Sequence, residues 1–348
     1  MLLTYKYRIK DSNYKNELKY KANAVNQIWN YCNEISQMSA QRNNKWISEY
    51  DLNYLTAGNS KELKISSTTI QSVSKEYIKC RNKRRRPKLN WRSYKKSLGW
   101  IPFKASAIKQ TEAGFKYCGK EYKCWISRPM EGTIKCGSFN EDSQGKWYIN
   151  ITCEVQEALS DSTQSVGIDL GLKTLATLSD GNKIENAREY SQLEGKLAVA
   201  QRAGHKKQAR NIHKKIANRR KDYLHKETTK VVKQYKNIYV GNVSSSKLTK
   251  TRMAKSVNDA SWSSFKLMLG YKALRLGVNF AVVNESYSSV TCSACSKRTG
   301  PSGLSSLKVR CWDCECGASH DRDVNAALNI LRVGLGHEAP LGESPCFS

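Results

Sequence analysis

The segment Gly167–Gly171 reads Gly-Ile-Asp-Leu-Gly, so one carboxylate, that of Asp169, interrupts an apolar run. This run belongs to the first of three short predicted strands, which cover Ser165–Leu170, Lys173–Leu178 and Lys183–Asn186. A buried carboxylate without a partner is costly unless it becomes protonated. We therefore expect Asp169 to be paired, hydrogen-bonded or bound to a metal. Taken alone, this motif is equally consistent with an aspartate that only caps the following turn.

The same alternation of strands and helices continues downstream. We expect a long basic helical stretch over 188–236, then a strand, a helix, a further strand, a cysteine-rich insert and a last helix. The strands and helices after the basic stretch are placed at Asn237–Asn242, Met253–Leu276, Val278–Asn284 and Arg322–Leu331. This order, β-β-β-α-β-α-β-α, predicts an α/β domain with a mixed sheet.

Upstream, the sequence predicts a β-rich module that contains helices. Residues Leu2–Ile9 alternate as a strand does, and apolar residues between positions 25 and 35 recur at helical spacing. The composition turns polar near Ala158–Gln164, where we place the main domain boundary. The other expected elements are a helix at Thr69–Asn82 and strands at Phe115–Ile126 and Trp147–Val155.

Composition and charge indicate the class of partner. The chain has 348 residues, of which 39% are apolar, so it can bury a core. Its 59 Lys and Arg residues outnumber 30 Asp and Glu residues, and the net charge of +29 predicts nucleic acid as the partner. A membrane partner is not expected, because no apolar stretch approaches the ~18 residues of a membrane span. Without a signal peptide we expect an intracellular protein whose cysteines are reduced or metal-bound.

Two basic segments are predicted to contact nucleic acid. In the first, basic and aromatic residues alternate, which suits phosphate contacts together with stacking on bases; a loop that its aromatic residues pin to the core is the alternative. The second is the long helical stretch, whose rows of Lys and Arg could also form a solvated face. The predicted contacts are Arg84, Arg85, Arg86, Trp91, Arg92 and Lys95 in the first segment, and Lys206, Lys207, Arg219 and Arg220 in the second.

Two groups of cysteines near the end of the chain have the spacing of a zinc site. Cys292 and Cys295 form one knuckle, and Cys314 and Cys316 form the other. Two such pairs in an intracellular chain predict one structural Zn²⁺ with four sulfur ligands. Cys311 is an alternative ligand, because it has the more regular two-residue gap to Cys314.

A second acidic motif follows the cysteines. Residues His320–Ala327 read His-Asp-Arg-Asp-Val-Asn-Ala-Ala. Asp321 occupies the position of an N-cap, and Asp323 lies in the first predicted helical turn, where the helix dipole stabilises a negative charge. Each of these acids could therefore serve the helix alone.

Together these motifs resemble the TnpB family, the transposon-encoded RNA-guided DNA endonucleases that are related to the type V CRISPR effectors. The resemblance rests on Gly167–Gly171, on Asn218–Lys226 (Asn-Arg-Arg-Lys-Asp-Tyr-Leu-His-Lys), on the cysteine pairs and on His320–Ile330. It runs from about Ser165 to Leu331. Upstream, Ser97–Lys104 is similar to a further element of the family.

The resemblance implies an RNase H-like (RuvC) nuclease domain over 161–335, which contains the basic stretch 188–236 and a zinc ribbon at 288–319. It implies a wedge β-barrel over 1–160 with a helical recognition insert at about 12–100, and we expect a flexible tail at 336–348. The implied partners are a guide RNA and double-stranded target DNA, in a prokaryotic cytoplasm at the nucleoid. The oligomeric state stays open.

The resemblance also implies a Mg²⁺-dependent endodeoxyribonuclease in which two Asp and one Glu bind two catalytic Mg²⁺ ions about 4 Å apart. By motif, Asp169 and Asp323 are the two aspartates. The family places the Glu at the end of the fourth strand, where this chain has Gly241. Glu285 at the end of the fifth strand is the predicted replacement, because these strands are neighbours in such a sheet and Gly241 leaves room for its side chain. Asp259 is a weaker candidate.

These residues leave competing functions open. The first is cutting of DNA guided by a transposon-derived RNA, with Asp169, Glu285 and Asp323 as the catalytic residues. The second is guided DNA binding without nuclease activity, as a repressor, which the missing Glu at Gly241 motivates. A transposase that joins DNA ends is a third interpretation, because RuvC-like folds include such enzymes.

Overall fold

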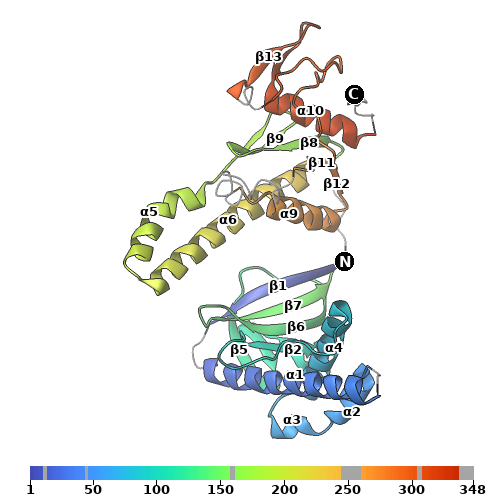
Figure 1. Cartoon of the computed structure of the whole chain (residues 1–348), viewed down its shortest axis with the longest axis vertical. Helices are drawn as coiled ribbons and strands as arrows, with labels where there is room; N and C mark the ends of the chain where they lie inside the picture. Colours follow the sequence, from blue (N-terminus) through green and yellow to red (C-terminus); the bar gives the residue numbers. More distant parts are fainter. Residues whose placement is uncertain (11–13, 44–45, 157–160, 244–259, 304–307, 337–348) are drawn as a thin grey trace. The chain divides into compact units, whose positions relative to one another are not determined.

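The computed structural model describes residues 1–10, 14–43, 46–156, 161–243, 260–303 and 308–336. The chain forms two compact units, Met1–Gln156 and Glu157–Ser348, and Figure 1 draws both. The division falls close to the boundary expected after residue 160. Asp259 and residues 337–348 of the expected tail lie outside the described residues. Within the described residues, no helix combines the length and the apolar character that a membrane span requires.

The first unit is built on a seven-stranded antiparallel sheet in the order β2-β6-β7-β1-β5-β4-β3. The strands are β1 (Leu2–Ile9), β2 (Trp100–Lys104), β3 (Ile108–Gln110), β4 (Gly114–Tyr117), β5 (Lys120–Trp125), β6 (Thr133–Glu141) and β7 (Trp147–Glu154). The alternation expected for β1 is confirmed, because every second residue of it is buried. Among the described residues β2 and β3 do not pair, so no ladder between them closes the expected barrel.

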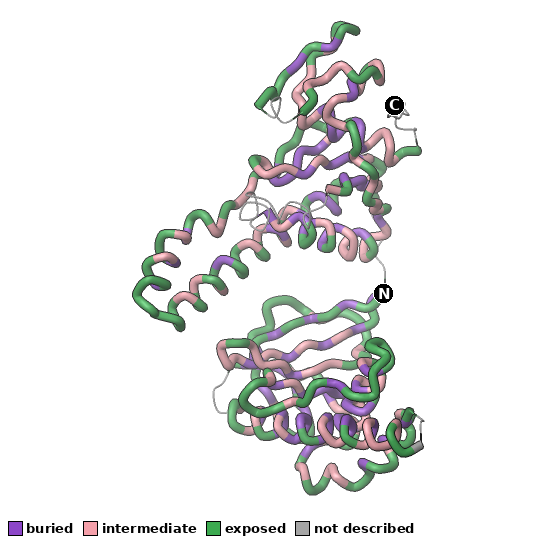
Figure 2. The backbone as a smooth tube through the Cα atoms, in the orientation of Figure 1, coloured by how far each residue is buried: buried purple, intermediate pink, exposed green. Residues whose placement is uncertain are grey.

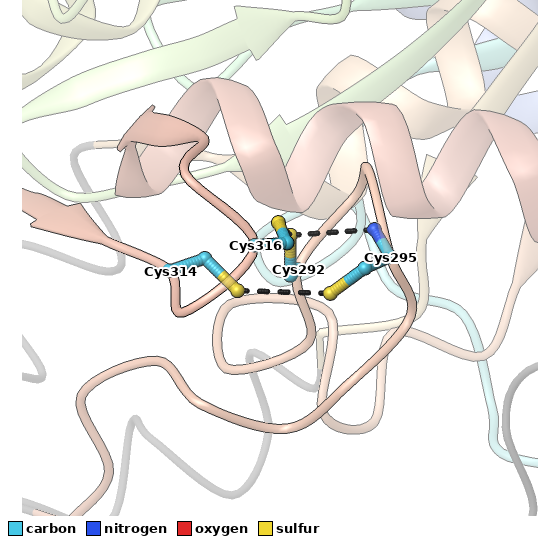
Figure 3. Close-up of side chains that lie close together, drawn as sticks. All are labelled: Cys292, Cys295, Cys314 and Cys316. Carbon is cyan, nitrogen blue, oxygen red and sulfur yellow. Dashed lines mark hydrogen bonds between the residues drawn. The ribbon is translucent and has the colours of Figure 1, made fainter.

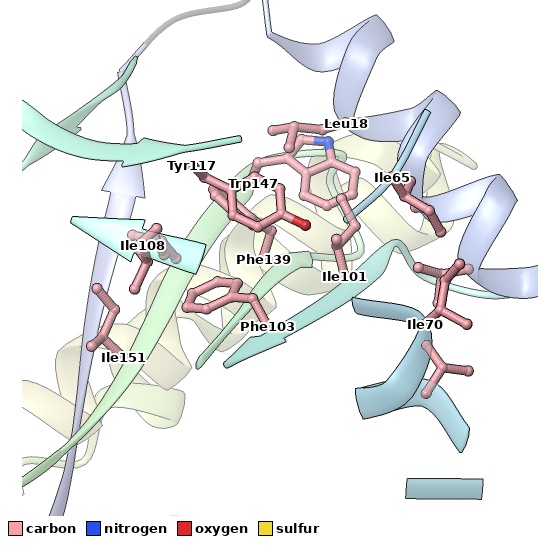
Figure 4. Close-up of a cluster of buried hydrophobic side chains, with 14 of the residues drawn as sticks. Leu18, Ile65, Ile70, Ile101, Phe103, Ile108, Tyr117, Phe139, Trp147 and Ile151 are labelled. Atoms are coloured by element: carbon pink, nitrogen blue, oxygen red, sulfur yellow. The ribbon is translucent and has the colours of Figure 1, made fainter. Parts of the chain in front are cut away.

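Helices separate β1 from β2, where the insert is expected. They are α1 (Lys15–Asn43), α2 (Glu49–Leu55), α3 (Asn59–Glu62) and α4 (Ser67–Arg84). The helical spacing of residues 25–35 is confirmed, since they lie in α1. Leu18 of α1 and Ile70 of α4 join Phe103 and Phe139 of the sheet in one hydrophobic core (Figure 4). This unit therefore has a core of its own.

The second unit contains a five-stranded sheet in the order β10-β9-β8-β11-β12. The strands are β8 (Ser165–Leu170), β9 (Thr174–Leu178), β10 (Lys183–Glu185), β11 (Asn237–Gly241) and β12 (Asn279–Val283). β8, β11 and β12 are adjacent and parallel, whereas β9 runs antiparallel to both of its neighbours. The expectation that the first, fourth and fifth strands are neighbours is therefore confirmed.

The long basic stretch is two helices rather than one, α5 (Glu189–Arg202) and α6 (Lys206–Gln234). Gly204 between them has a φ of +68°, a conformation that glycine adopts without strain, and the chain reverses there (Figure 1). No residue of α6 before Ile216 is buried, whereas Leu224 and Val232 further along it are buried (Figure 2). Only the second half of α6 therefore packs into the core.

Helices α9 (Trp262–Arg275) and α10 (Arg322–Gly334) lie on opposite faces of this sheet (Figure 1). Ile168 of β8 belongs to the core that α6 and α9 complete. Its neighbour Gly167 approaches α10 so closely that a Cβ would overlap the carbonyl oxygen of Ala327. Because side chains alternate along a strand, Asp169 lies on the same face as Gly167 and α10.

Candidate carboxylate site and cysteine cluster

Asp169 lies at the carboxyl end of β8. The register pairs Ile168 with Val240 of β11, and Val240 with Val282 of β12. Gly241 follows Val240, so it stands in β11 at the level of Asp169. The carboxyl ends of three parallel strands thus meet beside Asp169, which is where ligand sites form in parallel sheets.

Glu285 follows the end of β12 and reaches back over β11. A Cβ at position 241 would overlap Oε2 of Glu285, so the carboxylate fills the space that the glycine leaves. The Val243 N–H donates to this carboxylate, and the Glu285 N–H donates to Oδ1 of Asn242 at 3.4 Å. Oε2 itself is buried and has no hydrogen-bond partner. A cation fits beside a buried oxygen of this kind.

Asp323 lies in the first turn of α10. Asp321 caps this helix by accepting from the backbone N–H groups of Asp323 and Val324, so the expected N-cap is confirmed. Nη1 of Arg310 donates to both carboxylate oxygens of Asp323, at 3.1 and 3.2 Å, and Lys183 pairs with Asp321 at 2.8 Å. The sequence did not predict that Arg310 and Lys183 bind these acids. Neither residue lies three or four positions from its acid, as an ion pair within one helix would.

Glu285 and Asp323 both act on the carboxyl group of Asp169. Asp169 keeps some solvent access, yet its pKa rises to about 7, first because burial disfavours the charged form and then because Glu285 and Asp323 repel it. Burial also raises the pKa of Glu285, against the positive charge of Lys266. A bound cation would relieve this repulsion, so the donor set fits a divalent metal.

The carboxylates are spread too widely to surround a single ion. Within the described residues, the only group of three or more possible ligand atoms that all lie within 4.8 Å of one another consists of cysteines. Asp169, Glu285 and Asp323 nevertheless come together where β8, β12 and α10 meet. Their oxygens are hard ligands of the kind that Mg²⁺ prefers. The fold thus gathers the three predicted acids without forming a closed cage.

Cys292, Cys295, Cys314 and Cys316 form the cysteine group (Figure 3). The sulfur atoms of Cys292 and Cys316 lie 3.7 Å apart, and those of Cys295 and Cys314 lie 3.6 Å apart. Four ligands about 2.3 Å from a Zn²⁺ ion stand about 3.8 Å from one another in a tetrahedron, so the spacing fits zinc. Cys311 is exposed in β13 (Cys311–Asp313) and lies outside the group.

The surroundings of the cysteines favour metal binding. The N–H of Cys316 and the hydroxyl of Thr299 lower the pKa of Cys314 to about 6, which favours the thiolate form that binds a metal. Nε2 of His320 lies 3.0 Å from Sγ of Cys292. His320 belongs to β14 (Ser319–Asp321), which pairs with β13. Sequence reasoning did not assign His320 to the cluster.

Comparison with known proteins shows the family. A family model described as "Probable transposase" matches residues 148–252, and one described as "Cas12f1-like, TNB domain" matches residues 262–330. A "Putative RNA-guided DNA endonuclease" of Streptomyces pristinaespiralis is 31% identical over 314 residues, which cover 85% of this chain and 76% of that protein. This chain belongs to the TnpB family.

Two further proteins resemble this TnpB chain. The "TnpB-like protein L79" of Acanthamoeba polyphaga mimivirus is 26% identical over 271 residues, 68% of this chain and 51% of that protein. The solved Cas12f1–sgRNA–target DNA complex matches with a TM-score of 0.59 at 13% identity, over 92% of this chain and 83% of that one. At this identity, the second likeness concerns the fold.

Most of the predicted nucleic-acid contacts in this TnpB chain are exposed. These are Arg84, Arg85, Arg86, Trp91 and Lys95 around the loop after α4, and Lys206, Lys207 and Arg219 on α6. Trp91 is 50% exposed. Arg219 also pairs with Glu189 of α5, at 3.5 Å.

Arg92 and Arg220 are half-buried instead. The guanidinium of Arg92 donates to Oδ1 of Asn26 at 2.7 Å and to the carbonyl oxygen of Leu98 at 3.1 Å. It also lies over the rings of Trp29 and Trp100. Arg92 thus helps to hold the basic loop against α1, whereas Trp91 and Tyr94, the aromatic residues beside it, are exposed.

Proposed function

We propose that this TnpB protein is an RNA-guided DNA endonuclease that cuts with Asp169, Glu285 and Asp323. The observation that supports this most is the place of Glu285. Its carboxylate fills the space beside Gly241, on the strand that lacks the family's usual acid. The Streptomyces relative is named for the same activity, and the solved structure with this fold is a complex with sgRNA and target DNA.

The three acids would bind Mg²⁺, which when bound supplies an activated water and neutralises the leaving oxygen in phosphodiester hydrolysis. The chain's own groups orient these ligands. The Val243 N–H holds the carboxylate of Glu285, and the cap formed by Asp321 fixes the first turn of α10, which carries Asp323. The cysteine cluster would hold a structural Zn²⁺, because four sulfur ligands leave no open coordination position.

The exposed basic surfaces are the proposed contacts for nucleic acid. We propose that a transposon-derived guide RNA and double-stranded target DNA contact the loop after α4 and the first half of α6. Both surfaces present several exposed Lys and Arg side chains, which neutralise phosphates whatever the base sequence. In such a system base pairing with the guide selects the target, so the protein needs few base contacts.

The test is a cleavage assay with RNA that co-purifies with the chain from its host, Mg²⁺ and DNA matched to the guide end of that RNA. The wild-type protein should cut. Asp169→Ala and Glu285→Gln should bind the same DNA but cut more than about 100-fold more slowly. Glu112→Gln is the control, because Glu112 is exposed and lies outside the carboxylate site. Cutting by Asp169→Ala at the wild-type rate would contradict the proposal.

The same assay separates the other interpretations. A wild-type protein that binds matched DNA with Mg²⁺ but leaves it intact would be the guided repressor that Gly241 suggests. Joined DNA ends would instead indicate a transposase, as the description of the family model over residues 148–252 says of that family.

A further inference from the structure

We infer that Asn325 and Asn329 are positioning residues that couple the cysteine cluster to Asp323, so that loss of zinc displaces this acid. The inference rests on the proposed function only where it treats Asp323 as a ligand of the catalytic metal. The four clustered cysteines belong to residues 288–303 and 308–321, which we call the ribbon.

The side chains of Asn325 and Asn329 lie one turn apart on α10 and are 1% and 7% exposed. Nδ2 of Asn329 donates to the carbonyl oxygens of Ser288 and Thr291, at 2.8 and 2.7 Å. Nδ2 of Asn325 donates to the same two oxygens, at 3.2 and 2.8 Å. Two buried amides of α10 therefore hold the start of the ribbon.

The same contacts enclose the first metal knuckle. Oδ1 of Asn325 accepts from the Ser293 N–H at 2.9 Å. Thr291 and Ser293 flank Cys292, so α10 binds the backbone on both sides of this fully buried ligand. A movement of Cys292 would break these bonds or carry α10 with it, and breaking them costs free energy because it leaves buried amides and carbonyls without partners.

The second half of the ribbon holds the start of α10. The Arg322 N–H donates to the carbonyl oxygen of Arg310 at 2.7 Å. The side chain of Arg310 binds both oxygens of Asp323. His320 joins the two halves, since Nε2 lies 3.0 Å from Sγ of Cys292 while the next residue, Asp321, caps α10.

Asp323 is thus fixed by the ribbon from two sides, and the coupling must act in both directions. Binding of a divalent cation at the carboxylates should slow the loss of zinc from the ribbon. Disturbing the asparagine contacts should speed the loss of zinc and raise the Mg²⁺ concentration that cutting requires.

The test compares wild type with Asn329→Leu, which keeps the side-chain volume and favours a helix but removes the amide. Ala294→Ser is the control, because Ala294 is an exposed residue of the ribbon. The RNA-bound proteins are mixed with a zinc-selective colorimetric chelator, with and without Ca²⁺. The rate of zinc release and the Mg²⁺ concentration for half-maximal cutting are measured. Asn329→Leu should change each by about 10-fold or more, with guided DNA binding unchanged.

A purely structural role of Asn329 would lower the fraction of active protein and leave the Mg²⁺ midpoint where it is. That outcome, or zinc release at the wild-type rate, would overturn the inference. Should Asn329→Leu fail to fold, the wild type still decides, because Ca²⁺ must slow its release of zinc. If the wild type does not cut DNA, the proposed function fails, while the zinc measurements still test the coupling.

Discussion

The carboxylate of Glu285 occupies the space that a side chain at Gly241 would need. Gly241 is the last residue of β11, and Glu285 follows the end of the neighbouring parallel strand β12. The small glycine makes room for the glutamate side chain. Glycine leaves the end of β11 open, and the acid that follows β12 turns into the opening, where its Oε2 is buried without a hydrogen bond. A carboxylate at this level of the sheet can therefore come from either strand.

Replacing Gly241 by alanine should lower cutting by more than about 10-fold, because the added methyl group overlaps the Glu285 carboxylate. Guided DNA binding should not change. Gly195→Ala in α5 is the control, since nothing lies within 4 Å of a Cβ there. The double variant Gly241→Glu with Glu285→Ala moves the acid to β11 and should regain part of the activity. Equal rates for Gly241→Ala and wild type would contradict this account.

The response to Mg²⁺ should depend on pH. Because the pKa of Asp169 is raised from 3.8 to about 7, the folded chain keeps a proton that the unfolded chain loses. Without divalent ions, the contribution of Asp169 to the free energy of unfolding therefore falls as pH rises from 3.8 to about 7. Mg²⁺ replaces the proton, so the increase in melting temperature on adding Mg²⁺ should be larger at about pH 8 than at about pH 5.5.

Thermal unfolding with Mg²⁺ and with EDTA across this pH range checks the prediction. Asp169→Asn is the control, because an amide does not titrate between these values. An increase in melting temperature that is independent of pH in the wild type would argue against Asp169 as a ligand.

The choice among five cysteines can be tested by single substitutions. Cys314→Ser should lose zinc, because Sγ of Cys314 lies 3.6 Å from that of Cys295 within the cluster. Cys311→Ser should keep one zinc ion per chain, because Cys311 is exposed and outside the cluster. Elemental analysis of the purified proteins measures this. Loss of zinc from Cys311→Ser would show that Cys311 is a zinc ligand.

Trp91 should stack on nucleic acid. Trp91→Ala should weaken binding of the guide RNA or of target DNA by about 1–3 kcal/mol, the value of one base–aromatic stack. Trp125 offers a close match, because it is 58% exposed against 50% for Trp91 and also lies near a lysine, Lys10. Filter binding of both variants gives the comparison. An equal loss of affinity in the two variants would show that Trp91 has no specific contact with nucleic acid.

Lys206 and Lys207 at the start of α6 should contact phosphates. Replacing both by alanine should reduce the slope of log affinity against log salt by about 1 to 2, since each phosphate contact contributes about 0.9. Lys109 and Lys116, which pair across β3 and β4 and are exposed, provide a control double variant. A slope unchanged by the first double variant would place the nucleic acid elsewhere.

Local sequence patterns predicted much of the second unit. The strands β8, β9 and β11 and the cap at Asp321 were placed from short apolar runs, turn residues and helix-start chemistry. The cysteine spacing predicted the cluster of Cys292, Cys295, Cys314 and Cys316, and the structure was needed only to exclude Cys311 as the alternative. The Arg310–Asp323 contact and the hydrogen bonds of Asn325 and Asn329 could be found only in the structure. They join segments that are distant in the sequence, so no local pattern predicts them.

The first unit shows a different limit. Strand β6 (Thr133–Glu141) escaped prediction because its residues do not alternate between buried and exposed. Its Gly137 leaves space that the ring of Phe103 fills. Phe139 is the only buried residue of β6, so the strand carries little apolar signal. The break between α5 and α6 at Gly204 was also missed. A single glycine among good helix formers is a weak signal for the end of a helix.

The order of Asp169, Glu285 and Asp323 along the chain has a consequence for biosynthesis. A ribosome releases the first unit and the hairpin of α5 and α6 long before residue 323 emerges. A nascent protein can therefore expose the surfaces that we propose to contact phosphates while Asp323 is still unmade. If the proposed function is right, translation itself would delay cutting until RNA has had time to bind.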